Sequence, residues 1–136
     1  MPRKHCYIFS LCAVVIFVGG CPFTGLVYEE DLVNGYAVWA NDVVEQAHIV
    51  RKRQGSSGYS TTVVPRTVFA YGWNDDVIIA KRHPEKKDGK VDISTTHWYI
   101  VEVASAKVHG PLSEGEFNKL RTKLKVPAEI SFKTIK

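Results

Sequence analysis

Residues 68–80 read VFAYGWNDDVIIA and predict a β-hairpin. Two runs of mainly apolar residues, 68–71 and 77–80, flank a short polar segment, and such runs are typical of strands. The segment Trp73-Asn74-Asp75-Asp76 supplies asparagine and aspartate, whose side chains hydrogen-bond to nearby backbone groups and favour a turn. The chain is therefore expected to contain a pair of antiparallel strands here.

Further strands are expected on both sides of this hairpin, because short runs of Val, Ile, Thr and aromatic residues alternate with turn residues. The expected strands span residues 35–40, 48–53, 60–64, 66–71, 76–82, 97–104 and 129–133. Ser105-Ala106 predicts a second hairpin turn, which leads into Lys107-Val108-His109. Residues 41–46 are compatible with a helical turn, and the pattern does not decide between that turn and a strand connection.

One helix is specified near the C-terminus. Ser113-Glu114-Gly115-Glu116 matches a capping box, in which the serine caps the helix and the glutamate returns to the serine backbone. Phe117, Leu120 and Leu124 then lie on one helical face, which needs a sheet to cover it. These elements predict an α+β fold, with an antiparallel β-meander of about six or seven strands and one C-terminal helix packed on the sheet.

The N-terminus has the features of a targeting segment. Arg3 and Lys4 provide a positive start, and residues 6–18 form an apolar run without a charge. The run has the length of a secretory signal and is shorter than the roughly 20 residues of a membrane-spanning helix. It ends in Val18-Gly19-Gly20-Cys21, which resembles the lipobox of bacterial lipoproteins.

The lipobox resemblance implies cleavage between Gly20 and Cys21 and lipidation of the Cys21 thiol. Two or three acyl chains make a durable membrane anchor, whereas one chain is marginal. Two alternatives are an uncleaved anchor and an ordinary signal peptide in which the cysteine is incidental. The expected location is the cell envelope, with the domain held by lipid on the periplasmic or extracellular face of a membrane.

The expected organisation is a signal peptide at 1–20, a lipidated cysteine with a tether at 21–34, and one globular domain at 35–136. A chain of 136 residues leaves no room for a second domain. Removal of Arg3 and Lys4 lowers the formal net charge from +4 to +2. Cys6 and Cys12 leave with the signal, so the mature domain is expected to have no disulfide and no free thiol.

No catalytic or metal-binding constellation is apparent in the sequence. The chain has no G-x-S-x-G motif, no glycine-rich phosphate loop and no histidine pair at metal-ligand spacing. Asp75 and Asp76 are adjacent, so on a strand they would point to opposite faces. The protein is therefore predicted not to be an enzyme, and to use no cofactor and no metal.

Basic and aromatic residues suggest a binding surface instead. Basic clusters occur at residues 51–53 and 81–90, and they suit an anionic lipid or envelope polymer. Tyr59 and Trp73 fall at a loop and a turn, where aromatic side chains can anchor a partner. Tyr59, Trp73, Lys86 and Lys87 are the candidate binding residues; the alternative is that the rings belong to the core and the lysines are simply solvated.

Four segments together resemble a family of short bacterial lipoproteins that is known only as a domain of unknown function. They are Gly35-Tyr36, residues 72–81 (GWNDDVIIAK), Trp98-Tyr99-Ile100-Val101, and residues 109–113 (HGPLS) followed by Glu116-Phe117. The resemblance covers most of the mature chain and implies no activity and no catalytic residues.

The expected function is that of a lipid-anchored envelope protein acting as a non-enzymatic binding or structural module. Its expected partners are the membrane, through Cys21, and an envelope protein or anionic envelope polymer, with no role for nucleic acid. The alternative is an envelope-displayed inhibitor or immunity protein against a toxin or lytic enzyme.

Overall fold

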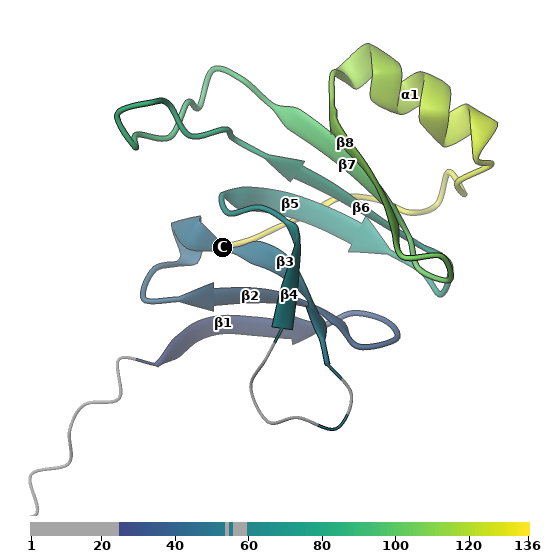
Figure 1. The fold of residues 1–136 in the computed structure, drawn as a ribbon. Helices are drawn as coiled ribbons and strands as arrows, with labels where there is room; N and C mark the ends of the chain where they lie inside the picture. The colour runs from purple at the N-terminus through teal and green to yellow at the C-terminus, as the bar shows by residue number, and fades with distance from the viewer. Residues whose placement is uncertain (1–24, 54, 56–59) are drawn as a thin grey trace, which may run out of the picture.

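The computed structural model describes residues 25–53, 55 and 60–136, which form two antiparallel sheets and one α-helix (Figure 1). The N-terminal sheet has the order β1 (Leu26–Asp31), β2 (Tyr36–Asn41), β3 (His48–Lys52) and β4 (Ser60–Val64). The C-terminal sheet has the order β8 (Lys107–Leu112), β7 (His97–Glu102), β6 (Val77–Arg82), β5 (Val68–Trp73) and β9 (Lys133–Thr134). A 3₁₀ turn, η1 (Val44–Gln46), joins β2 to β3, and α1 spans Glu114–Lys123.

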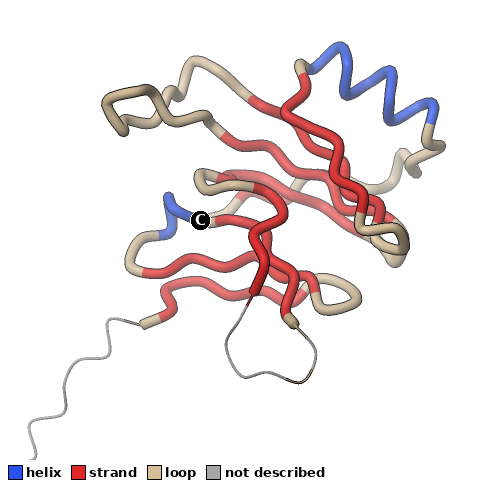
Figure 2. Tube along the Cα trace, viewed as in Figure 1, coloured by secondary structure: helices blue, strands red, loops and turns tan. Residues whose placement is uncertain are grey.

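The α+β class and the antiparallel pairing are confirmed, but the strands form two sheets and not a single meander. The physical reason lies in β6, where Val77, Ile78, Ile79 and Ala80 are all buried. Successive residues of a strand point to opposite faces, so this run needs an apolar layer on each side of its sheet. The N-terminal sheet covers one face and α1 covers the other (Figure 2).

Two hydrophobic cores fill the spaces between these three layers. The core between the sheets is made by Tyr36, Val38, Ala40, Ala47, Ile49, Val64, Val68, Tyr71, Ile78, Ala80, Tyr99, Val101 and Val103. The core under the helix is made by Val77, Ile79, Ile100, Phe117, Val126 and Ile130. Ile78 and Ile79 thus belong to different cores, as strand alternation requires.

The predicted capping box is present at the start of α1. The Glu116 backbone N–H donates to Ser113 Oγ at 3.3 Å, and the Ser113 N–H donates to Glu116 Oε2 at 2.8 Å. Phe117 is the buried residue of this helix, with 1% of its surface exposed. Arg121 donates to the carbonyl oxygens of Pro127 and Ile130, at 2.8 and 2.9 Å, and so ties the segment after the helix to it.

Both predicted hairpins are confirmed, as β5–β6 and β7–β8. The expected strand at 129–133 is mostly wrong, because only Lys133–Thr134 pairs, with β5. The segment left undecided at 41–46 contains η1. Among the described residues, no helix has the length and hydrophobicity that crossing a membrane would require.

The expected tether at 21–34 is wrong in its second half. Residues 26–31 form β1, which pairs with β2 along the edge of the N-terminal sheet. Tyr28 and Glu30 point into the space between the sheets, where they meet Tyr71. The domain therefore begins at Leu26, five residues after Cys21. Cys21 itself and the expected signal peptide at 1–20 lie outside the described residues.

Candidate functional site

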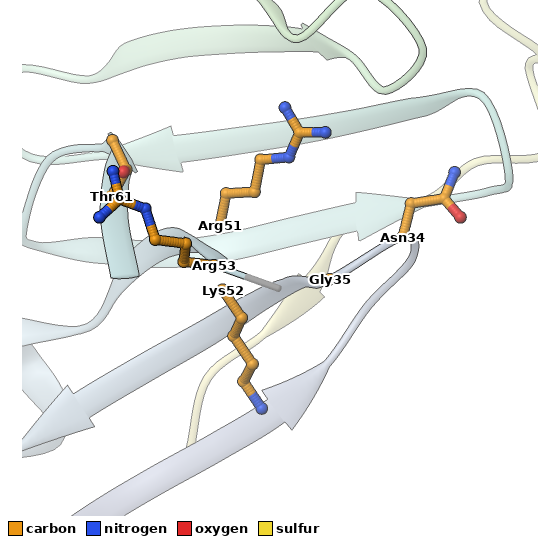
Figure 3. A pocket seen from close by; sticks show the side chains of 6 residues that line it. All are labelled: Asn34, Gly35, Arg51, Lys52, Arg53 and Thr61. Atoms are coloured by element: carbon orange, nitrogen blue, oxygen red, sulfur yellow. The ribbon is translucent and has the colours of Figure 1, made fainter. Parts of the chain in front are cut away.

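A basic cleft of about 370 Å³ opens at one end of the N-terminal sheet (Figure 3). It lies where the β1–β2 turn meets the end of β3 and the start of β4. The side chains and backbone that line it belong to Asn34, Gly35, Arg51, Lys52, Arg53 and Thr61. The basic cluster at 51–53 noted in the sequence thus lines this cleft.

The backbone of the cleft is fixed by a tight turn and by strand pairing. Asn34 and Gly35 adopt positive φ angles of 46° and 80°, which glycine tolerates without steric cost. The Lys52 N–H donates to the Gly35 carbonyl at 2.7 Å, so the turn is joined to the end of β3. On the other side of β3, Arg51 is paired with Thr61 of β4.

Lys52 is held by two carboxylates of β1. Its Nζ lies 2.6 Å from Asp31 Oδ1 and 2.6 Å from Glu29 Oε1. The side chain crosses β2 to reach them, because β2 lies between β1 and β3. These hydrogen bonds, first that to Asp31 and then that to Glu29, raise the pKa of Lys52. Lys52 therefore remains protonated, but its charge is already neutralised by the protein.

Arg51 and Arg53 carry the charge that is left for a ligand. Arg51 points away from Lys52, as successive strand residues do, and Arg53 points towards Thr61 (Figure 3). The Arg51 guanidinium carbon lies 5.4 Å from the centre of the Tyr36 ring, a cation–π contact that orients it. In the described part of the chain, no carboxylate comes within 4.0 Å of either guanidinium.

The other residues singled out in the sequence are dispersed. Trp73 lies at the end of β5, where its ring stacks on that of Tyr71 at 5.8 Å and packs against the core between the sheets. Lys86 and Lys87 are exposed in the β6–β7 connection, and Lys86 Nζ is 3.9 Å from Asp92 Oδ1. Tyr59, Gly20 and Cys21 lie outside the described residues.

A polar cluster between the two sheets was not anticipated from the sequence. The Tyr28 hydroxyl lies 2.7 Å from Glu30 Oε2 and 2.6 Å from the Tyr71 hydroxyl, which also donates to Glu30. Lys133 Nζ lies 2.5 Å from the same carboxylate. Only the strand-like run Leu26-Val27-Tyr28 hinted that this segment belongs to the fold.

The pKa values in this cluster follow from burial and from the shared carboxylate. Burial acts against ionisation of Glu30, but the hydrogen bonds from Lys133, Tyr71 and Tyr28 outweigh it and lower its pKa. Burial, reinforced by the hydrogen bond to Glu30, strongly raises the pKa of Tyr71. The hydrogen bond to Glu30 also raises the pKa of Lys133. Glu30 is therefore ionised at neutral pH and holds the sheets together by accepting three hydrogen bonds.

His83 and His109 make separate local contacts. His83 stacks on Phe69 with ring centres 4.3 Å apart, and its Nδ1 lies 2.8 Å from the Thr95 carbonyl. His109 Nε2 lies 2.6 Å from Glu102 Oε1 on the neighbouring strand. Across the described ranges, no three His, Cys, Asp or Glu residues gather in a way that could hold a metal ion.

Comparison with known proteins gives a family and no activity. No curated protein and no solved structure shows significant similarity to the chain. A family described as "Protein of unknown function (DUF3997)" matches residues 33–136, which include β2 to β9, α1 and the three cations of the cleft. Because the match covers well over half of the chain, this protein belongs to the DUF3997 family.

Proposed function

We propose that this protein is a lipid-anchored component of the cell envelope and that its domain is a non-enzymatic binding module for an anionic envelope polymer. The anchor is Cys21, in the lipobox-like sequence Val18-Gly19-Gly20-Cys21. The binding site is the basic cleft, with Arg51 and Arg53 as the recognition residues.

The observation that carries this proposal is the position of the cleft relative to the start of β1. The chain enters the domain at Leu26, and β1 then runs towards the turn at Asn34 and Gly35, which lines the cleft. Six residues of strand span about 20 Å. The cleft thus lies at the far end of the sheet from the anchor and is open to material beyond the membrane surface.

The chemistry of the cleft suits phosphate or carboxylate groups. A guanidinium presents a planar fork of N–H donors that matches the two oxygens of either group. Lys52 is neutralised by Glu29 and Asp31, so a ligand interacts chiefly with Arg51 and Arg53. A repeating polymer binds such a site more strongly than a single anion does, because a neighbouring anionic group of the same chain can enter the cleft when one group leaves it.

Anchoring is tested by metabolic labelling with a palmitate analogue. The full chain is expected to incorporate the label and to fractionate with membranes, whereas Cys21→Ala is expected to do neither. A Cys21→Ala chain that still incorporates the label would refute the anchor.

Binding is tested with purified full-length protein and polyphosphate as the anionic probe, with neutral dextran as the negative control. The double variant Arg51→Gln/Arg53→Gln is expected to bind polyphosphate at least about tenfold more weakly, the effect of losing two charge-assisted contacts. The matched control Lys87→Gln/Lys90→Gln removes the same charge from the β6–β7 connection and is expected to bind as the parent does. If both double variants lost the same affinity for polyphosphate, binding would depend only on the net charge of the protein, and the assignment of the cleft as the binding site would be overturned.

A further inference from the structure

One end of the β-sandwich carries almost all of the large apolar side chains that are exposed. In the described part of the chain there are six of these, namely Leu26, Val27, Val43, Val91, Ile93 and Val108. The first five lie at the end where β1 starts, β2 finishes and β6 leads towards β7, and Ile93 is 78% exposed. Single exposed apolar residues scattered over a surface are normal, but several of them at one end of a domain indicate an interaction surface.

The same end contains an apolar groove of about 460 Å³. Its apolar lining includes Val44 of η1, Phe69 of β5, Val91, Ile93 and Ile135. Figure 1 shows these segments along the left side of the molecule, with the β6–β7 connection at the top, η1 and the C-terminus at mid-height and the start of β1 at the bottom. We name this end, with Leu26, Val27, Val43, Val91, Ile93 and the groove, the apolar end.

We infer that the apolar end docks onto the lipid bilayer that holds the protein, with Val91 and Ile93 reaching into the headgroup and upper acyl region. This inference rests on the proposed lipidation of Cys21. Leu26 is the fifth residue after Cys21, and a fully extended chain of five residues spans about 17 Å. Leu26 belongs to the apolar end, so the anchor keeps this end, and not the basic cleft, within reach of the membrane.

The charges of the β6–β7 connection indicate whether docking depends on anionic lipid headgroups. The β6–β7 connection carries Lys86, Lys87 and Lys90, but Lys86 and Lys90 lie 3.9 and 3.8 Å from Asp92 and Asp88. Glu85 balances the remaining lysine in formal charge. Docking is therefore driven by burial of apolar side chains, and it needs no anionic lipid.

The experiment uses the full-length chain, matured in a bacterial host and reconstituted into phosphatidylcholine vesicles that contain a nitroxide-labelled lipid. A thiol-reactive fluorophore is placed at Ile93→Cys, or at Ala104→Cys as the control, which is exposed at the opposite end of the sandwich. The label at position 93 is expected to lose several-fold more emission to the lipid quencher than the label at 104. The parent chain without an introduced cysteine is expected to take up no fluorophore, because its single remaining thiol is lipidated.

A second set of variants tests whether the apolar side chains are responsible. With the label at Val43→Cys, the change Val91→Ser/Ile93→Ser is expected to abolish most of the quenching. Val108→Ser, which removes an equally exposed valine at the other end, is expected to leave it unchanged. Neither change touches the buried core, so both proteins are expected to fold.

The outcomes separate this inference from the proposed function. Protein that does not float with the vesicles, or a parent chain that takes up fluorophore, overturns the anchor and with it the docking. Protein that floats but shows equal quenching at positions 93 and 104 leaves the anchor in place and overturns the docking. Energy transfer between labels at position 93 without lipid quenching would assign the apolar end to a second copy of the chain and also overturn it.

Discussion

Replacing Glu30 by glutamine is expected to weaken the connection between the two sheets. Glu30 lies on β1, and its carboxylate accepts hydrogen bonds from Tyr28, Tyr71 and Lys133. Tyr71 and Lys133 belong to the C-terminal sheet, so the carboxylate is a polar link across the sandwich. Glutamine has nearly the same shape, but it brings no charge and turns one acceptor into a donor.

The loss of stability in Glu30→Gln can be worked out from the number of hydrogen bonds to the Glu30 carboxylate and from its exposure to water. A hydrogen bond to a charged group contributes about 1.5–3 kcal/mol, and an unsatisfied buried hydroxyl costs about 1–3 kcal/mol. The Glu30 side chain is 24% exposed, so water compensates part of the loss. Glu30→Gln is therefore expected to lower the free energy of unfolding by about 2 kcal/mol near neutral pH. For a domain of about 110 residues this corresponds to a fall in Tm of about 8 °C.

The pH dependence gives this prediction a definite sign. The pKa of Glu30 is lower in the folded protein than its ordinary value of 4.5. Its stabilising effect is thus fully present above about pH 4.5 and is lost as the pH falls through the folded-state pKa. The unfolding curves of the parent and of Glu30→Gln, measured by urea denaturation, should differ at neutral pH and converge in strong acid.

A matched control is available on the same strand. Glu29 pairs with Lys52 on the exposed face, and Glu29→Gln is expected to cost less than about 1 kcal/mol, as surface ion pairs do. A Glu30→Gln variant that loses no more stability than Glu29→Gln would refute the reasoning. A difference from the parent that stays constant into strong acid would also refute it, because the charge would then not be its origin.

Three further substitutions test the layers of the fold by urea denaturation. Phe117→Ala empties the core under the helix and is expected to cost about 3–5 kcal/mol, and a loss below about 1 kcal/mol would show that α1 is not held by this ring. Gly72→Ala would place a Cβ 2.2 Å from the Ser131 carbonyl oxygen, so a backbone shift costing about 1–3 kcal/mol is expected, and an unchanged Tm would contradict the close approach of β5 to that segment. Ser113→Ala removes the N-cap and is expected to cost about 1 kcal/mol, while Ser113→Asp should retain most of the stability.

The parts of the fold that were predicted correctly depend on neighbours in sequence. The β5–β6 hairpin follows from Asn74, whose side-chain oxygen accepts from the Asp76 and Val77 N–H groups at 2.9 Å. The start of α1 follows from Ser113 and Glu116, three residues apart. In each case the stabilising contacts lie within a few residues, so local chemistry is sufficient.

The parts that were mispredicted depend on distant contacts. The segment with Glu29, Glu30 and Asp31 resembles a solvated lead, because three adjacent acids rarely enter a sheet. Its acids are paired with Lys52 and Lys133, which lie more than twenty and about one hundred residues further along the chain. The division into two sheets also depends on long-range packing, because β6 buries side chains on both of its faces, one against the N-terminal sheet and the other against α1.

In the candidate site, too, the sequence shows which charged residues are present, and the tertiary structure determines which of them are paired. The sequence presents Arg51, Lys52 and Arg53 as three equivalent cations. Strand alternation separates Lys52 from Arg51, and pairing with β1 neutralises Lys52. The number of charges that can bind a ligand is therefore set by the register of β1 against β2, because that register places Glu29 and Asp31 within reach of Lys52. The pairing of Lys52 with Glu29 and Asp31, while Arg51 and Arg53 have no carboxylate partner among the described residues, is a consequence of tertiary structure alone.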